Sequence, residues 1–433
     1  MGKHSPCNPH QSKEICFKLS FYLLIISSLL VGLFTGRAFF FNLALMLVGI
    51  ILIAWLWVWL SIRNIGLTRR TRSRRAQVGE LFEETFIIRN RSFLPKLWLE
   101  IDDQSTLPGH RASTITPPLI FQSVYQWRVR TRCLVRGEFS LGPLVIASED
   151  PFGLFRLTRY IPATSKIVVY PRVLQVNKIE HPMGVLSGGE AQRRRTHYIT
   201  TNASGVRDYA PGDSFNRIHW RSTARRDKLI VKEFELDPLV DIWLFADYSA
   251  DSLVEDTNLV RRINGTGAVI SHTTGIPPST EEYVTVITAS LARYFVSQER
   301  IMGFSAYIPS REIYQPERSK RQMTRILEAL AVARSVSPYT LSQMLTLETP
   351  YFSRGATVII VTASLDMDWV KRAQTLSRRG IRPMCIFVDP QSFLPNEQRQ
   401  SDNIISALRS AKIPVIRVQN GNDIVAILQQ RTT

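Results

Sequence analysis

The sequence predicts a multi-domain protein: an N-terminal transmembrane α-hairpin, then a β-sandwich, then a doubly wound α/β domain. Three observations predict this. Two apolar stretches lie near the N-terminus, short alternating runs broken by turn residues follow, and the last part alternates apolar strands with amphipathic helices. A length of 433 residues is sufficient for these units.

Residues 17–62 are expected to form two transmembrane helices after a cytoplasmic N-terminus over residues 1–16. The second apolar stretch, 38–62, exceeds the roughly 20 residues that cross a bilayer. The basic juxtamembrane segment, residues 63–75, carries six arginines and no acidic residue. By the positive-inside rule this flank is cytoplasmic, which predicts a multi-pass protein of the cell membrane with cytoplasmic C-terminal domains. A cleaved signal peptide is the alternative interpretation of the first stretch.

The net charge of +18 does not by itself indicate a nucleic-acid partner. Ten basic residues and one acidic residue fall within the first 75 positions, beside the apolar stretches, where they determine topology and contact anionic lipid. We therefore expect the membrane, and no nucleic acid, as a partner. Four scattered cysteines show neither a metal-ligand pattern nor a disulfide framework; they are Cys7, Cys16, Cys133 and Cys385.

Short alternating runs between residues 76 and 172 predict the β-sandwich. Residues 173–204 are polar and include GGEAQRRR, which predicts a connector. A phosphate-binding loop is excluded there because the G-x-x-x-x-G-K-[ST] spacing is missing.

Residues 205–235 form the most informative segment, GVRDYAPGDSFNRIHWRSTARRDKLIVKEFE. It resembles the defining motif of the domain-of-unknown-function 58 family, and we call it the signature segment. The matching positions are Gly205, Arg207, Tyr209, Gly212, Asp213, Arg217, Ile218, His219, Trp220, Ala224, Arg225, Glu233, Phe234 and Glu235. The resemblance implies a membrane-anchored protein, in the inner membrane of a bacterium, with a von Willebrand factor A-like domain over residues 236–433.

Turn residues, a short helix and a strand are expected in the signature segment, and three roles are open for it. One is a buried polar network in which Arg207 and Arg217 bind carboxylates. Another is a partner-binding surface, and the third is a nucleophilic site of His219 with Ser222 or Ser249, which lacks the G-x-S-x-G turn. The candidate signature or partner-binding residues are Arg207, Tyr209, Gly212, Asp213, Arg217, His219, Trp220, Arg225 and Glu233.

The resemblance also implies a divalent-cation site, written Asp-x-Ser-x-Ser, at the carboxyl ends of the strands. This chain offers Asp247, Ser249 and, in place of the second serine, Asp251. After a later strand it has Thr362-Ala363 where the family pattern places an acid, and Asp366 is the nearest acidic residue. We expect no cofactor, with Mg²⁺ the metal that this incomplete oxygen set would take.

These observations favour a membrane-anchored cytoplasmic scaffold or adaptor over an enzyme. The family resemblance implies a partner among the MoxR-type AAA+ ATPases, in protein maturation or complex assembly, and the loop at 251–280 lies on the expected binding face. The alternative is a hydrolase built on the α/β domain. Neither the oligomeric state nor the identity of the partner follows from the sequence.

Overall fold

The computed structural model describes residues 9–179, 203–211, 215, 218–234, 241–255, 275–308, 310–394 and 401–429. The chain divides into two compact units, one formed by residues 1–172 and the other by most of residues 173–433. We describe each unit by itself.

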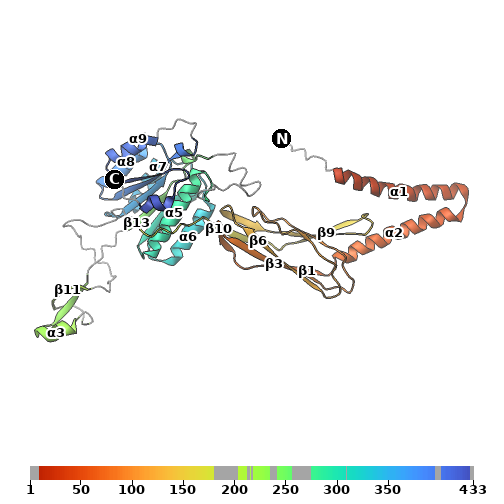
Figure 1. The fold of residues 1–433 in the computed structure, drawn as a ribbon, viewed down its shortest axis with the longest axis horizontal. Coiled ribbons are helices and arrows are strands. Elements are labelled where there is room, and N and C mark those ends of the chain that lie inside the picture. Colours follow the sequence, from red (N-terminus) through yellow and green to blue (C-terminus); the bar gives the residue numbers. More distant parts are fainter. Residues whose placement is uncertain are drawn as a thin grey trace. The chain divides into compact units, whose positions relative to one another are not determined.

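Two helices open the first unit, α1 (Pro9–Thr35) and α2 (Ala38–Ile62). They contact each other, and Ser28 Oγ donates a hydrogen bond of 2.9 Å to the carbonyl of Phe40 (Figure 1). Helix α2 is long and apolar enough to cross a membrane, whereas the apolar part of α1, Ser20–Thr35, is shorter. Helix α1 begins at Pro9, within the segment expected to be a separate N-terminus.

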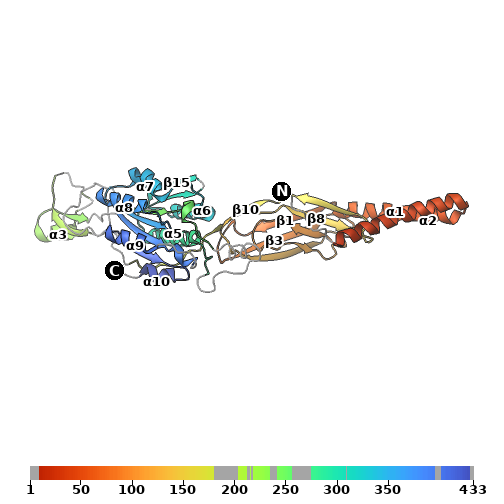
Figure 2. The ribbon, with the colours of Figure 1, turned by 90° about the horizontal axis from the view of Figure 1, so that it is seen from above.

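Ten strands follow in the first unit. They are β1 (Ile65–Thr71), β2 (Arg75–Gln77), β3 (Leu81–Asn90), β4 (Glu100–Asp103), β5 (Thr114–Ile115), β6 (Val124–Arg132), β7 (Gly137–Leu141), β8 (Leu144–Glu149), β9 (Arg156–Ile161) and β10 (Ser165–Tyr170). They form three sheets with the orders β1-β3-β6, β5-β4-β8-β9 and β2-β10-β7. Phe86 and Ile88 of β3 share one apolar core with Ile101 of β4 and with side chains of β8. The first two sheets therefore pack face to face (Figure 2).

The boundary between the helices and the strands differs from the sequence expectation. Residues 65–71, expected to lie in the basic juxtamembrane segment, form β1 and pair with β3 from Ile65↔Asn90 to Thr71↔Glu84. The interpretation of this arginine run as a separate segment at the lipid surface is therefore wrong for Arg69, whose side chain is buried.

The second unit has a six-stranded sheet with the order β15-β14-β13-β16-β17-β18. Its strands are β13 (Ile242–Ala246), β14 (Met302–Ile308), β15 (Ser310–Glu317), β16 (Thr357–Thr362), β17 (Arg382–Val388) and β18 (Val415–Val418). All neighbouring strands are parallel except β14 and β15. The main helices are α5 (Thr280–Ser297), α6 (Lys320–Val332), α7 (Leu341–Glu348), α8 (Asp368–Arg378), α9 (Ser401–Ser410) and α10 (Ile424–Gln429).

Helices cover both faces of this sheet. One core joins α5, α6 and α10 to the sheet, and a second joins α7, α8 and α9 to it. The expected doubly wound arrangement of strands and helices is thus present in a mixed α/β, multi-domain molecule.

The signature segment forms a small module of its own. Strand β11 (Ala203–Asp208) pairs antiparallel with β12 (Ile230–Phe234), and the short helix α3 (Trp220–Arg226) lies between them in sequence. Figure 1 shows these elements together. We call residues 203–234 the signature hairpin.

Candidate functional site

The signature hairpin displays side chains that a protein core normally buries. Among its described side chains the buried apolar ones are Ile218, Ile230 and Val231, and α3 has no buried residue. Phe215 and Trp220 are 68% and 67% exposed. Aromatic residues are enriched at protein interfaces, so these two exposed rings suit a binding surface.

Backbone contacts hold α3 against β12 and so fix the position of Trp220. The amide of His219 donates to the carbonyl of Ile230 at 2.8 Å, and Ile218 forms an isolated bridge with Val231. The exposed side of α3 is basic, because its exposed charged side chains are all arginines; these are Arg221, Arg225 and Arg226.

Only one member of the expected polar network is described together with a contact. Arg207 is exposed, and its guanidinium donates to the carbonyl of Asp208 at 3.1 Å. Its other expected partners, Asp213 and Glu233, have side chains outside the described residues, so the network stays a prediction. Gly212, Asp213 and Arg217 lie outside the described residues, as does the side chain of Glu233.

His219 and Ser222 come together, as one of the hydrolase interpretations requires. Nδ1 of His219 lies 2.6 Å from Oγ of Ser222. However, the two residues are three apart at the start of one short helix, and within the described part of the chain no carboxylate contacts His219. A local contact of this kind does not orient a base as a catalytic triad does. The other expected nucleophile, Ser249, is buried.

Asp247 and Ser249 follow the carboxyl end of β13, a central strand of the large sheet. Strand β14 pairs with one side of β13 and β16 pairs with the other, so the strand order reverses between β13 and β16. At such a point the carboxyl ends of the strands border the crevice where α/β sheets place ligands. Oδ2 of Asp247 accepts a hydrogen bond of 2.6 Å from Oγ1 of Thr362, and Oδ1 accepts one of 2.9 Å from the amide of Ser249. Asp247 is 1% exposed.

These residues do not fit a complete Mg²⁺ site. Burial, with a smaller contribution from the charge of Asp251, raises the pKa of Asp247. Oγ of Ser249 is buried without a hydrogen-bond partner in the described part of the chain. Ala363 offers no oxygen, Asp251 is exposed, and Oδ1 of Asp366 already accepts from the amide of Asp368 at 3.0 Å.

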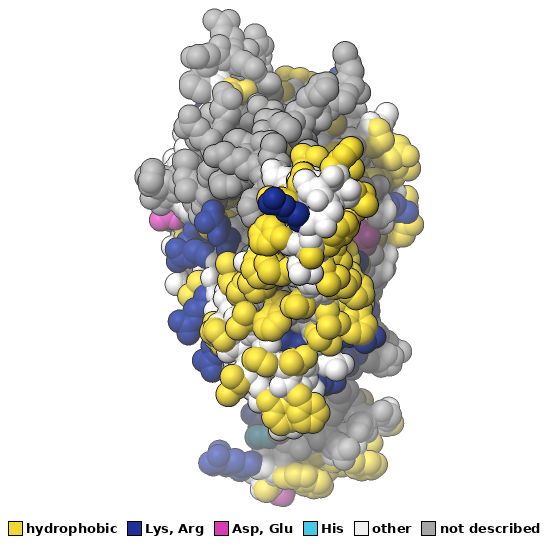
Figure 3. All heavy atoms as spheres, turned by 90° about the vertical axis from the view of Figure 1, so that its right-hand side faces the viewer, with side chains coloured by type: hydrophobic (Ala, Val, Ile, Leu, Met, Phe, Trp, Pro, Cys, Tyr) yellow, Lys and Arg dark blue, Asp and Glu magenta, His cyan; other side chains and the backbone are white. Residues whose placement is uncertain are grey.

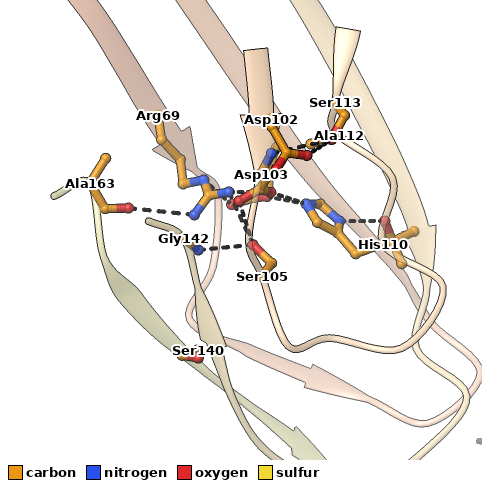
Figure 4. Close-up of polar contacts among 12 residues, drawn as sticks. Arg69, Asp102, Asp103, Ser105, His110, Ala112, Ser113, Ser140, Gly142 and Ala163 are labelled. Atoms are coloured by element: carbon orange, nitrogen blue, oxygen red, sulfur yellow. Dashed lines mark hydrogen bonds and ion pairs between the residues drawn. The ribbon is translucent and has the colours of Figure 1, made fainter. Parts of the chain in front are cut away.

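The sequence analysis missed a buried ionic cluster in the first unit. Arg69 of β1, Glu84 of β3, Asp103 of β4 and His110 meet between the two packed sheets (Figure 4), with side chains 0–4% exposed. Nε2 of His110 lies 3.0 Å from Asp103 and 3.1 Å from Glu84, and the guanidinium of Arg69 pairs with both carboxylates. Nδ1 of His110 lies 2.8 Å from Oγ1 of Thr131.

The charges of this cluster balance when the ring of His110 is protonated. Burial opposes that charge, but hydrogen bonding and ion pairing with Asp103 and Glu84 outweigh it and raise the pKa of His110 to about 9. Two cations then face two carboxylates. The ligand atoms of Glu84, Asp103 and His110 lie within 4.8 Å of one another, as metal ligands do. Here Arg69 already supplies the positive charge, and the ring nitrogen that a metal would need faces both carboxylates as a donor, so the cluster fits ion pairing and not a metal.

Comparison with known proteins gives a family match over part of the chain and a relative of 26% identity. The described chain is a multi-domain mixed α/β protein with one apolar helix long enough to span a membrane. Within it, the family model described as "Protein of unknown function DUF58" matches residues 205–274, which include β12, Asp247 and Ser249. The "Uncharacterized protein YeaD" of Bacillus subtilis (strain 168) is 26% identical over 226 residues, covering 48% of this chain and 55% of that protein. The chain thus spans about half the length of this curated relative.

Similarities to solved structures are low. Proximal thread matrix protein 1 from the mussel byssus aligns with a TM-score of 0.30 and 12% identity, over 45% of this chain and 47% of that chain. The CARDB domain of a Pyrococcus furiosus protein, in complex with di-metal ions, aligns with a TM-score of 0.18 and 10% identity, over 24% of this chain and 87% of that chain. Neither similarity supports an argument about fold or function.

Proposed function

We propose that this protein is a membrane-anchored scaffold or adaptor that presents the signature hairpin and a von Willebrand factor A-like domain to a protein partner in the cytoplasm. The mostly parallel sheet, covered by helices on both faces, supports the domain assignment. The exposed apolar surfaces of α1 and α2 support the anchor.

The observation that carries the proposal is the exposed surface of the signature hairpin. Phe215 and Trp220 are about two-thirds exposed on a module whose helix buries nothing, and three arginines flank them. Aromatic rings and arginines are the residue types that contribute most to binding at protein interfaces. An acidic surface with an apolar pocket is the complementary partner, and a MoxR-type AAA+ ATPase is the candidate that the family resemblance suggests.

Co-purification of an ATPase from solubilised membranes tests this proposal. The full chain is purified as wild type, Trp220→Ala and Leu81→Ala, the last being an exposed apolar residue of β3 and a matched control. We expect an ATPase to accompany wild type and Leu81→Ala, and its amount to fall at least about tenfold with Trp220→Ala, since an anchor residue contributes 2 kcal/mol or more. Equal recovery with Trp220→Ala would contradict the role of the hairpin.

Wild type and a further variant, His219→Ala, test the hydrolase alternative. Labelling of Ser222 by a serine-directed activity probe that is lost in His219→Ala would favour an enzyme. The geometry predicts no labelling, because the contact between His219 and Ser222 lacks a carboxylate in the described chain.

A further inference from the structure

A group of exposed apolar side chains lies near the C-terminal end of α2, where the helix leads into β1. Five loop residues and the first residue of β6 form it, and we call them the apolar collar: Phe93, Leu94, Leu97, Ile120, Phe121 and Val124. Phe93 is 84% exposed and Ile120 is 67% exposed. Figure 3 shows the apolar surface at the end of the molecule that α1 and α2 form. The collar lies outside these helices and adds a second exposed apolar surface.

Contacts with the end of α2 place the collar at the depth of the last helical turn. The buried ammonium of Lys96, in the first loop, donates to the carbonyl of Leu60 in α2. The amide of Arg91 donates to the carbonyl of Asn64, two residues beyond the helix, at 2.9 Å. Arg63 lies 3.9 Å above the ring of Trp59, and aromatic and basic residues of this kind mark the interface of a membrane helix.

Hydrogen bonds hold the two loops of the collar together. The buried side-chain amide of Asn90 donates to the carbonyls of Leu94, Leu119 and Ile120 at 2.9, 3.1 and 3.2 Å. Lys96 and Leu119 exchange backbone hydrogen bonds of 2.9 and 2.7 Å. These hydrogen bonds tie the two loops to each other while their apolar side chains point outward.

The rings and charges of this region suit a lipid surface. Phe93 and Phe121 stack with their ring centroids 4.6 Å apart. Neither loop, residues 91–97 or 117–123, contains Asp or Glu, while Arg63, Arg89 and Arg91 are exposed beside them. Apolar side chains surrounded by arginines are typical of segments that insert into the headgroup region of anionic membranes.

We propose that the apolar collar inserts into the membrane interface and seats the first unit on an anionic lipid surface beside α2. The proposal rests on the membrane anchoring proposed above and adds a second, peripheral contact with the same bilayer. This contact limits how far the β-rich unit tilts away from the membrane.

Photocrosslinking of the full chain in vesicles of phosphatidylglycerol and phosphatidylethanolamine tests this contact. A benzophenone amino acid replaces, one at a time, Phe93, Phe121, Leu45 or Leu81, and lipid adducts are measured by mass spectrometry. Leu45 is an exposed residue of α2, and Leu81 is 62% exposed at the far end of β3, about 30 Å from Asn90 along the strand. We expect lipid adducts at positions 93, 121 and 45, and only background at position 81.

The outcomes separate the collar from the anchor. Lipid adducts at position 45 without adducts at 93 and 121 would overturn the collar and leave the anchor intact. Protein adducts at 93 and 121 in place of lipid would also overturn it, in favour of a partner or a second copy. Background at all four positions would contradict the membrane anchoring itself.

Discussion

His110 is buried beside two carboxylates, and these carboxylates determine whether its ring is protonated. Its ring contacts Asp103 and Glu84, and the guanidinium of Arg69 pairs with the same two carboxylates. The same contacts outweigh the effect of burial on Asp103, whose pKa is lowered. Each ionised group is therefore stable only while its neighbours keep their charges.

This arrangement predicts that the first unit loses stability at alkaline pH. The folded-state pKa of His110, about 9, lies above its unfolded value of 6.5. The stabilisation is therefore complete below pH 6.5 and is lost as the pH rises through about 9, by at most about 3 kcal/mol. Calorimetry of the solubilised full chain should show the melting temperature of the first unit falling across this window.

His110→Gln is the matched control, since it keeps hydrogen-bonding groups and removes the titration. That variant should be less stable at neutral pH and should lack the decrease above pH 6.5. A decrease of the same size in His110→Gln would show that another group causes it.

At the scale of elements, Asp247 joins the carboxyl ends of β13 and β16. Its two oxygens bind Thr362 and the amide of Ser249 inside the sheet edge. Asp247→Ala should therefore lower the free energy of unfolding by about 1–3 kcal/mol for each donor left unpaired. Asp251→Ala, at an exposed position two residues beyond Ser249, should change it little.

EDTA should leave the melting temperature of the wild-type protein unchanged, because the donor set does not fit Mg²⁺. Thermal unfolding with EDTA and with added Mg²⁺ makes the comparison. An increase with Mg²⁺ that disappears in Asp247→Ala would contradict this account and identify Asp247 as a metal ligand.

The order of most elements could be predicted from the sequence because their apolar patterns are strong. The β13 and β16 segments are continuous apolar runs, and α8 repeats its apolar residues at helical spacing. Strand β15 is hard to predict because it lies at the sheet edge, where polar residues and Pro316 interrupt the apolar pattern. Helix α7 is hard to predict because it has only eight residues.

The sites were less predictable because their partners are distant in sequence. In the sequence, Arg69 is one of several arginines in a basic run. It pairs with Asp103 in the fold, and no local sequence pattern relates these two residues. The pairing of Thr362 with Asp247 likewise depends on strand order. Glu84 alternates with the inward-facing Phe82 and Phe86 of β3, and an acidic residue at such a position is a local signal that could have indicated the buried ionic cluster.

At the scale of the whole molecule, the proposal depends on which side of the membrane the folded units occupy. The N-terminal region and the segment after α2 are rich in basic residues, and Arg37 is the single charged residue between the two helices. This distribution predicts both flanks in the cytoplasm and the Arg37 turn outside.

Fusion reporters in a bacterial host measure this arrangement most directly. Green fluorescent protein fluoresces when it is made in the cytoplasm, and alkaline phosphatase is active only when it is exported. With the reporter after Thr433 we predict fluorescence without phosphatase activity, and with the reporter after Arg37 the reverse. Phosphatase activity without fluorescence at Thr433 would contradict the account, since both units would then lie outside the cytoplasm in which the proposed partner is found.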